Sequence, residues 1–297
     1  MIAVMGASGN VGSKTADRLL REGNQVRVFG RSPERLEPLR ELGAEVIVGD
    51  ALNTEDLQVL FRDADAALVV LPDNVADPHY ASNRSRMSRA IVEALSDQRV
   101  GHVVMASSLG AERDRGVGPV NTLHELEELL FGLADTNVLS NRAALHMEQN
   151  FLPAIPVIQN QGINATAFRA DLRMPLIATV DIADRAALHL ASRDFSGHGV
   201  ETVLGPEDLT MDEATQAVAE ALGVSGVRYL QLPPEDTRGA LQNAGMSEAF
   251  ATLLVEMQVT ANEGLFDTVV RTPEATTPTT IRDFLQETIR RSPSPTM

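Results

Sequence analysis

Cysteine is absent from this chain of 297 residues. Its absence excludes disulfides, thiolate nucleophiles and cysteine-ligated zinc. Lysine is nearly absent too, because Lys14 is the single lysine among 25 basic residues. No other lysine is therefore available for catalysis.

Long apolar runs are also missing. The most apolar stretch, Ala64 to Leu71, is broken by Asp65, and a membrane span needs about 20 apolar residues. No basic segment followed by an apolar run opens the chain, since residues 1–5 lead directly into glycines. We therefore expect a cytoplasmic protein without a membrane partner.

The formal net charge of −16 argues against direct binding to nucleic acid, which requires clustered lysine and arginine. The histidines show no HxxxH spacing or partner spacing typical of a metal site, so we predict no metal. Apolar residues make up 43% of the chain and charged residues 22%, which is ordinary for a globular protein. Composition alone thus leaves enzymes and small-molecule binding proteins open.

The first half of the chain alternates short apolar runs with amphipathic stretches. The predicted strands cover residues 2–5, 25–30, 45–48, 66–71, 102–106 and 137–139. The predicted helices cover residues 13–22, 33–42, 54–61, 84–96 and 122–133, the last opened by a capping box at Thr122. Strand and helix alternate at least five times, which predicts an α/β, Rossmann-type, doubly wound parallel sheet.

A glycine-rich loop follows the first predicted strand and opens the first predicted helix. In its GxxGxxG spacing, Gly6 allows the tight turn, Gly9 lets the backbone approach a pyrophosphate, and Gly12 allows close packing of helix against strand. The amino terminus of the helix adds free N–H groups and a partial positive charge. The predicted phosphate-binding residues are Gly6, Ser8, Gly9, Asn10, Val11 and Gly12.

The end of the second predicted strand indicates which dinucleotide is bound. An NAD site usually has an acidic residue there, whereas this chain has Arg31, with Arg35 one helical turn further on. Arginine can pair with a 2′-phosphate, so we predict NADP(H) in preference to NAD(H). The alternative is that both arginines are solvated surface charges. The residues predicted to meet the rest of the nucleotide close the third and fourth strands: Asp50, Ala51, Leu71 and Pro72.

Beyond about Phe151 the alternation loosens. Helices are predicted at 181–192, capped by Asp181, at 210–222, in several pieces between 234 and 264, and at 281–290, with a strand at 227–232. We expect residues 1–152 to form the NADP(H)-binding domain and residues 153–297 mainly a smaller, mixed α/β, substrate-binding subdomain. Residues 179–205 are expected to return to the Rossmann sheet, and residues 291–297 to be a disordered tail.

Several segments together resemble one family, the NmrA-like group of atypical short-chain dehydrogenases. They cover almost the whole chain in the family's order: GASGNVG at 6–12, VRVFGRSPERL at 26–36, VGDALNTEDL at 48–57, SSLGAE at 107–112, NRAALHMEQNF at 141–151, VDIADRAALHL at 180–190, GPEDLTMDEA at 205–214 and TPTTIRDF at 277–284. The resemblance implies a Rossmann-type domain, a smaller carboxy-terminal subdomain and a cofactor cleft between them.

The catalytic Tyr-x-x-x-Lys pair of most short-chain dehydrogenases cannot be assembled from this sequence. The two tyrosines, Tyr80 and Tyr229, are followed four residues later by Arg84 and Pro233. The resemblance implies that this absence is typical of the NmrA-like group, which contains quinone and dye reductases alongside regulators that bind NADP without known turnover. The family thus predicts the cofactor better than the chemistry.

Candidate catalytic residues follow the fifth predicted strand, near which the nicotinamide lies in such folds. Ser107 and Ser108 are there, and His124 is on the next helix with Glu128 one turn further on, placed to orient it. If the protein is an enzyme, His124 or a water held by Ser107 would protonate the oxygen of the reduced carbonyl or quinone. The alternative is that His124 only decorates the start of a helix.

The resemblance also places Arg142 and Asn150 near the nicotinamide end of the cofactor. Relatives commonly carry a proline after the arginine, where Ala143 stands here. We therefore predict that Ser107 and Arg142 contribute to the cofactor site, and that Ser108, His146 and Asn150 line the substrate pocket.

The leading functional hypothesis is an NADPH-dependent oxidoreductase that reduces a small quinone, enone or carbonyl compound. It predicts an apolar pocket beside the nicotinamide. The alternative is a non-catalytic NADP(H) sensor of the NmrA type that binds a regulatory protein partner. Either protein would be a monomer or a homodimer.

Overall fold

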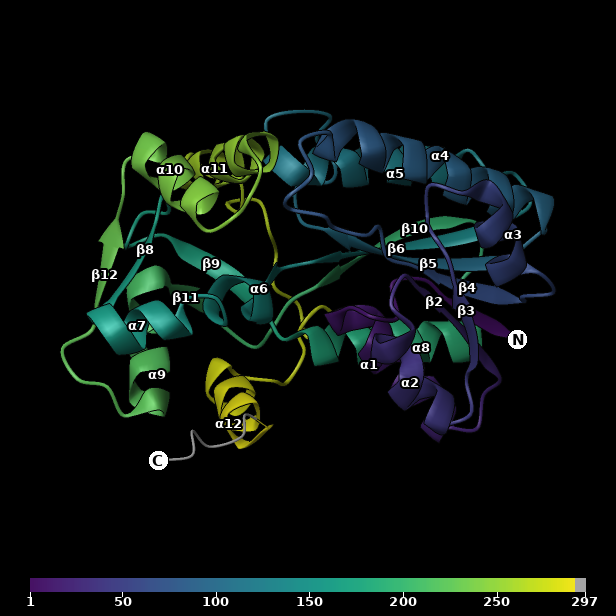
Figure 1. Ribbon diagram of the computed structural model, residues 1–297, viewed down its shortest axis with the longest axis horizontal. Coiled ribbons are helices and arrows are strands. Elements are labelled where there is room, and N and C mark those ends of the chain that lie inside the picture. Colours follow the sequence, from purple (N-terminus) through teal and green to yellow (C-terminus); the bar gives the residue numbers. More distant parts are fainter. Residues whose placement is uncertain (292–297) are drawn as a thin grey trace.

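Seven parallel strands form the central sheet of the structure, a computed structural model that describes residues 1–291 (Figure 1). Their order across the sheet is β10-β6-β5-β4-β1-β2-β3, and every neighbouring pair is parallel. The strands are β1 (Ile2–Val4), β2 (Val26–Gly30), β3 (Glu45–Val48), β4 (Ala66–Val69), β5 (His102–Ser108), β6 (Asn137–Ala143) and β10 (His198–Val203). The predicted α/β doubly wound sheet is therefore confirmed.

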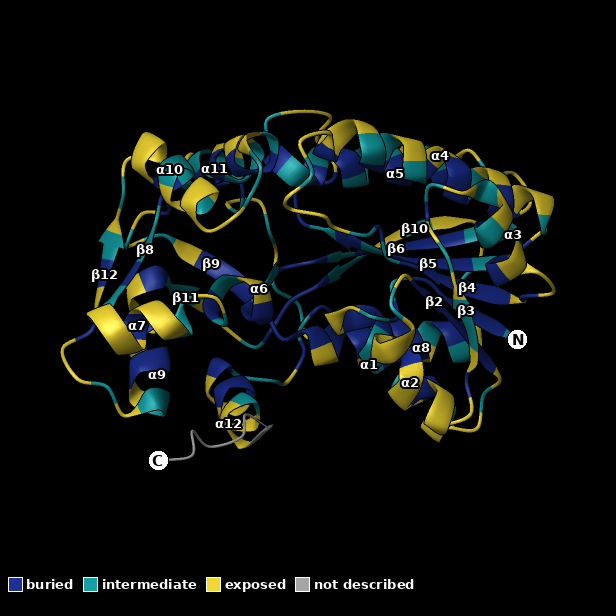
Figure 2. Ribbon diagram, viewed as in Figure 1, coloured by how far each residue is buried: buried dark blue, intermediate teal, exposed yellow. Residues whose placement is uncertain are grey.

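Helices cover both faces of this sheet (Figure 1). One face carries α1 (Asn10–Arg21), α2 (Pro33–Glu41) and α8 (Thr179–Ser192), and the other carries α3 (Thr54–Phe61), α4 (Tyr80–Asp97) and α5 (Asn121–Phe131). Because both faces are covered, the central strands are buried throughout, and they read in the sequence as continuous apolar runs (Figure 2).

A second lobe lies beyond the carboxyl ends of the central strands (Figure 1). It contains a three-stranded sheet in the order β11-β9-β7 and a two-stranded sheet, β12-β8. These strands are β7 (Leu145–His146), β8 (Ile163–Thr166), β9 (Arg173–Ile177), β11 (Asp208–Thr210) and β12 (Arg228–Gln231). The helices are α6 (Met147–Phe151), α7 (Ile155–Gln161), α9 (Met211–Leu222), α10 (Pro234–Asn243), α11 (Glu248–Asn262) and α12 (Ile281–Arg291).

The segment from α8 to β10 joins the second lobe back to the first. Helix α8 packs beside α1, where Ala186 and Leu190 share a buried cluster with Leu19. Strand β10 pairs with β6 from His198 opposite Val138 to Val203 opposite Ala143, which makes it the edge of the central sheet. The chain therefore passes from the sheet into the second lobe and returns to it before continuing.

Two predicted helix starts are wrong, while a third forms as its sequence indicates. Helix α5 begins at Asn121, and the Thr122 hydroxyl donates to the Pro119 carbonyl instead of capping the helix. Helix α8 begins two residues before Asp181, whose carboxylate accepts hydrogen bonds from Thr279. At α9, Thr210 forms a capping box with Glu213. In both cases the side chain is engaged elsewhere, Thr122 by a carbonyl three residues earlier and Asp181 by the distant Thr279.

Apart from Arg291, the last residue of α12, the predicted disordered tail lies outside the described residues. None of the helices in residues 1–291 combines the length and hydropathy needed to cross a membrane. Within the same residues, no cluster of three or more His, Asp or Glu side chains is arranged to hold a metal ion.

Candidate functional site

The glycine loop lies at the carboxyl edge of the sheet, between β1 and α1. On either side of β1, the strand order turns in opposite directions toward β2 and β4, and ligands of doubly wound sheets bind at this switch point. Gly6 has φ of +70°, and a Cβ on it would lie 2.9 Å from the Cβ of Val70. A Cβ on Gly12 would lie 2.4 Å from the carbonyl oxygen of Gly6. Glycine is therefore required at both positions by the backbone itself.

The first turn of α1 offers unpaired amides to a ligand. Gly9 is the N-cap and is exposed, and no side chain caps this helix end. Asn10 and Val11 follow it, and N–H groups in a first turn have no acceptor within the helix. No acidic side chain stands in that turn to oppose an anion. The Gly9 N–H donates to the Gly6 carbonyl, so the amides of Asn10 and Val11 are the ones that could hold a phosphate.

Arginines border the glycine loop at the end of β2. A Cβ on Gly30 would lie 3.2 Å from the Oγ of Ser8, so the loop touches the residue just before Arg31. Ser32 caps α2 by accepting a hydrogen bond from the N–H of Arg35. Both Arg31 and Arg35 are exposed, and in residues 1–291 neither guanidinium has a hydrogen bond or ion pair. These two cations are available to an anionic ligand.

The segments that follow β3 and β4 are held by local contacts. Asp50 accepts a hydrogen bond from the Leu52 N–H, and Ala51 is buried. The carbonyls of Leu71 and Pro72 both accept from Arg84 of α4, which also pairs with Asp73. Arg84 is 3% exposed, so a buried cation fixes the loop after β4.

A buried carboxylate joins the predicted site residues Ser107 and Arg142. Glu127 of α5 is 1% exposed, and it accepts hydrogen bonds of 2.5 Å from the hydroxyls of both Ser107 and Ser140. Its other oxygen pairs with Arg142 at 2.6 Å, and Arg142 also reaches Glu112 at 3.4 Å. Arg142 is thereby fixed by protein carboxylates. The sequence prediction missed Glu127, although its neighbour Leu126 places it on the inward face of α5.

His124 does not join that cluster. Its Nδ1 donates a 2.8 Å hydrogen bond to the carbonyl of Ala111, in the loop after β5. Glu128 is exposed and makes no contact with His124 within the described residues. The expected orienting role of Glu128 is therefore wrong, because a backbone carbonyl holds the imidazole instead. Ser108, predicted to line the pocket, donates its hydroxyl to the Leu109 carbonyl.

The single lysine connects the glycine-loop helix to the second lobe. Lys14 forms a 3.0 Å ion pair with Glu148 of α6 and a 2.5 Å hydrogen bond with Thr179, where α8 begins. Glu148 is 6% exposed and accepts further hydrogen bonds from Thr179. Burial alone would raise the pKa of Glu148, but Lys14 and Thr179 hold that pKa below its usual value. The lysine thus has a structural partner.

Neither tyrosine is placed as a proton donor with a lysine. Tyr80 is buried, donates its hydroxyl to Asp73 at 2.6 Å and packs edge-on against Phe250. Burial raises the pKa of Tyr229 to about 12, and its hydroxyl donates to the Phe168 carbonyl at 2.7 Å. The absence of a Tyr–Lys pair, read from spacing, therefore holds in three dimensions for the described residues.

His146 and Asn150 lie at the start of α6, directly after β7. His146 is the N-cap residue, and its carbonyl accepts a 2.8 Å hydrogen bond from the Asn150 side chain. Burial lowers the pKa of the His146 imidazole, so the ring is neutral at pH 7. These two predicted pocket residues are therefore neighbours, on the β7–α6 segment of the second lobe (Figure 1).

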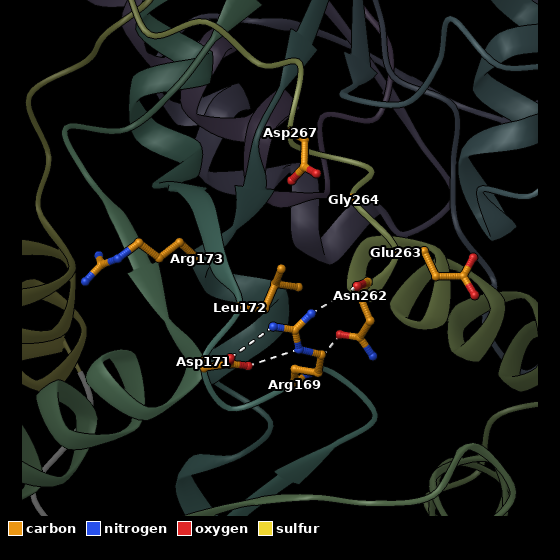
Figure 3. Close-up of a pocket in the computed structure, with 8 residues that line it drawn as sticks. All are labelled: Arg169, Asp171, Leu172, Arg173, Asn262, Glu263, Gly264 and Asp267. Carbon is orange, nitrogen blue, oxygen red and sulfur yellow. Dashed lines mark hydrogen bonds and ion pairs between the residues drawn. The ribbon is translucent and has the colours of Figure 1, made fainter.

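A depression of about 460 Å³ lies in the second lobe, apart from the glycine loop (Figure 3). Arg169 spans it, bonded to Asp171 and to the carbonyl of Asn262. Leu172 is the one apolar side chain among its lining residues: Arg169, Asp171, Leu172, Arg173, Asn262, Glu263, Gly264 and Asp267. It contains none of the predicted site residues, and its charged lining differs from the apolar pocket expected for an aromatic substrate.

Comparison with known proteins defines the class to which the chain belongs. Residues 6–139 match a family described as NAD(P)H-binding. The chain is 27% identical over 282 residues to an NAD(P)H azoreductase of Xenophilus azovorans, which covers 91% of both chains. It is 25% identical over 274 residues to quinone oxidoreductase 2 of Escherichia coli, which covers 90% of both. The fold and the glycine loop are therefore those of an NAD(P)H-binding oxidoreductase.

Two further matches refine this classification. Over 114 residues the chain is 33% identical to the NmrA-like family domain-containing oxidoreductase FrzB of Cladobotryum sp., covering 36% of this chain and 33% of that one. The solved structure of Citrobacter sp. triphenylmethane reductase with NADP(H) superposes with a TM-score of 0.81 at 20% identity, covering 97% of this chain and 99% of the other. The first match agrees with the resemblance to the NmrA-like group of atypical short-chain dehydrogenases, and the second shows that the fold is shared.

Proposed function

We propose that this protein is an NADPH-dependent reductase that transfers hydride to a quinone or a similar electron-poor carbonyl compound or dye. The observation that carries the proposal is the open glycine loop, with free first-turn amides beside the unpaired Arg31. The names of two relatives that match about nine tenths of the chain, an NAD(P)H azoreductase and a quinone oxidoreductase, support the choice of acceptor.

The residues present fit a dinucleotide laid across the carboxyl edge of the sheet. The amides of Asn10 and Val11 would hold the pyrophosphate, and Arg31 with Arg35 would pair with the 2′-phosphate. The remaining contacts would come from the segments after β3, β4 and β5 and from the end of β6: Asp50, Ala51, Leu71, Pro72, Ser107 and Arg142. NADPH, when bound, supplies the hydride.

Quinones suit a site without a Tyr–Lys pair, because a quinone that accepts hydride needs little acid catalysis. His124 and Ser107 remain the candidates for protonating the product, His124 from its fixed position beside Ala111. Ser107 would act through a bound water, since its own hydroxyl donates to Glu127. Unchanged NADPH oxidation by His124→Ala would remove His124 from the mechanism.

The test measures the decay of NADPH absorbance, and separately of NADH, against a panel of small quinones. Arg31→Ser removes the proposed 2′-phosphate partner, and loss of one charge-assisted hydrogen bond should raise KM for NADPH roughly tenfold and leave KM for NADH within about twofold. Arg99→Ser is the matched control, because Arg99 is also exposed and without an ion pair in residues 1–291, yet lies before β5 at the opposite edge of the sheet. Gly9→Asp should abolish cofactor binding.

The outcomes separate the parts of the proposal. Equal KM values for NADPH and NADH in the unaltered protein would reject the preference for NADPH. A protein that retains neither nucleotide would reject the cofactor site. Tight retention of NADPH without reduction of any quinone in the panel would leave the NADP(H) sensor as the function.

A further inference from the structure

His146 carries an imidazole that the fold leaves without a partner. It is half-buried at the junction of β7 and α6, in the part of the second lobe that the Glu148–Lys14 ion pair joins to α1 (Figure 1). Within residues 1–291 neither ring nitrogen forms a hydrogen bond, although the carbonyl of the same residue accepts one from Asn150. Because the ring is only half-buried and has no protein partner, its nitrogens are open to water or to a ligand.

Charged groups from both lobes act on His146. Burial is the strongest influence on its pKa and lowers it; Glu148 and Asp73 act in the opposite direction, and Lys14 lowers it further. Lys14 comes from the glycine-loop helix and Asp73 from the loop after β4. Those two segments stand on either side of the switch point between β1 and β4. The imidazole therefore lies within electrostatic reach of both sides of the crevice.

Hydrogen bonds of its own backbone and of the neighbouring Glu148 fix the position of the His146 ring. Its own carbonyl is tied to Asn150, and two residues later Glu148 is locked by Lys14 and Thr179. The start of α6 is thereby anchored to both α1 and α8. A catalytic side chain must be held in this way, because small displacements from the productive geometry cost rate.

Several other donors near the proposed crevice are already engaged. The Ser107 hydroxyl donates to Glu127, the Tyr80 hydroxyl to Asp73, and Lys14 pairs with Glu148. The Nδ1–H of His124 donates a hydrogen bond to the carbonyl of Ala111. Among these side chains His146 is the one whose donor is uncommitted in the described structure.

We infer that the N–H of His146 donates a hydrogen bond to the acceptor oxygen on which negative charge develops as hydride arrives. This role rests on the proposed function. The quinone gains a hydrogen with two electrons from the reduced nicotinamide, one of its oxygens becomes anionic, and water then supplies the proton that completes the hydroquinone. The neutral imidazole stabilises that oxygen during the transfer and is unchanged at the end.

The test compares His146→Phe and His146→Gln on two acceptors. A quinone develops an anionic oxygen, whereas a cationic triphenylmethane dye accepts hydride at its central carbon and becomes neutral without forming an oxyanion. Loss of one such donor typically costs about a hundredfold in kcat, so His146→Phe should lose about that factor with the quinone and less than about threefold with the dye. His146→Gln keeps an N–H donor and should recover at least about tenfold of the loss.

His198→Phe is the matched control, because His198 is exposed on the edge strand β10 and stacks on Phe131 away from the crevice. NADPH affinity, measured by fluorescence, confirms that each variant is folded. The role of His146 would be overturned if His146→Phe lost no kcat, or lost it equally with both acceptors. It would also be overturned if His146→Phe and His146→Gln behaved alike, or if His124→Phe showed the quinone-selective loss instead. If the unaltered protein does not reduce the dye, the difference in kcat between His146→Phe and His146→Gln with the quinone tests the role of His146. An unaltered protein that reduces no quinone rejects the proposed function itself.

Discussion

Replacing Lys14 with methionine would remove the cationic partner of a carboxylate that the fold has taken out of water. Glu148 is 6% exposed, Lys14 is 29% exposed, and their ion pair measures 3.0 Å. Breaking a fully buried pair costs about 3–5 kcal/mol, and an exposed pair contributes about 0–1 kcal/mol. Because Lys14 is partly exposed, we expect Lys14→Met to lower the free energy of unfolding at pH 7 by about 2 kcal/mol, between those limits.

The sign of the pH dependence follows from the pKa of Glu148. In the unaltered protein this pKa is held below 4.5, so the stabilisation is complete above pH 4.5 and is lost as the pH falls through the lowered pKa. In Lys14→Met, burial acts on the carboxyl without the lysine, and the pKa rises. At pH 5 the carboxyl can take up a proton and so avoid a buried unpaired charge. At pH 7 protonation is less favourable, so the buried carboxyl lowers the free energy of unfolding more. The difference between the two proteins should therefore be larger at pH 7 than at pH 5.

Urea unfolding followed by circular dichroism at the two pH values measures this difference. In Lys14→Met combined with Glu148→Gln, no unpaired charge is buried, so part of the stability should return at pH 7. Arg21→Met is the control, because Arg21 pairs with Asp17 on the exposed side of the same helix, where solvent screening should make its loss cost much less than the loss of Lys14. A loss of less than about 0.5 kcal/mol at both pH values, or no recovery in the double variant, would refute the reasoning.

Two further predictions concern other parts of the fold. In Gly12→Ala the new Cβ would lie 2.4 Å from the backbone of Gly6, so we expect a loss of about 2 kcal/mol in urea unfolding and weakened NADPH binding. Gly239 lies inside α10, and a Cβ built on it would have no neighbour within 4 Å, so Gly239→Ala should instead raise the free energy of unfolding by about 0.5–1 kcal/mol. Equal effects of the two substitutions would contradict both expectations. The hydrogen bond that His189 donates to Glu201 raises the pKa of His189 against the effect of burial, so its stabilisation is present below pH 6.5 and is lost as the pH rises through the raised pKa. Unaltered protein and His189→Gln should accordingly differ more in unfolding free energy at pH 6 than at pH 9, and the reverse order would show that the histidine is held neutral.

The parts of the fold that the sequence predicted depend on local signals. Strands such as β1 were placed to within a residue because a parallel sheet covered on both faces demands short apolar runs between turns. The glycine loop was recognisable because the positive φ of Gly6 and the tight approach at Gly12 each exclude a side chain. Both are requirements of the backbone within a few residues.

Features that depend on distant partners were not predictable in the same way. Strand β7 has two residues and exists because β9, about thirty positions later, pairs with it. The role of Glu127 is defined by hydroxyls on β5 and β6, and the sequence therefore drew attention to its neighbour Glu128 instead. His146 was predicted to line the substrate pocket, but only the folded structure shows which charged groups surround its ring and that the ring has no hydrogen-bond partner.

The return of the chain through α8 and β10 has a consequence for any attempt to divide this protein. A fragment ending near residue 152 would keep the glycine loop, yet it would lack the helix that shields Leu19 and the strand that pairs with β6. The bare edge of β6 would then be open to strands of other molecules. The nucleotide-binding half is therefore not a separable module, because α8 and β10, which complete it, follow the start of the other lobe in the sequence. Both halves must be synthesised before the cofactor crevice can form.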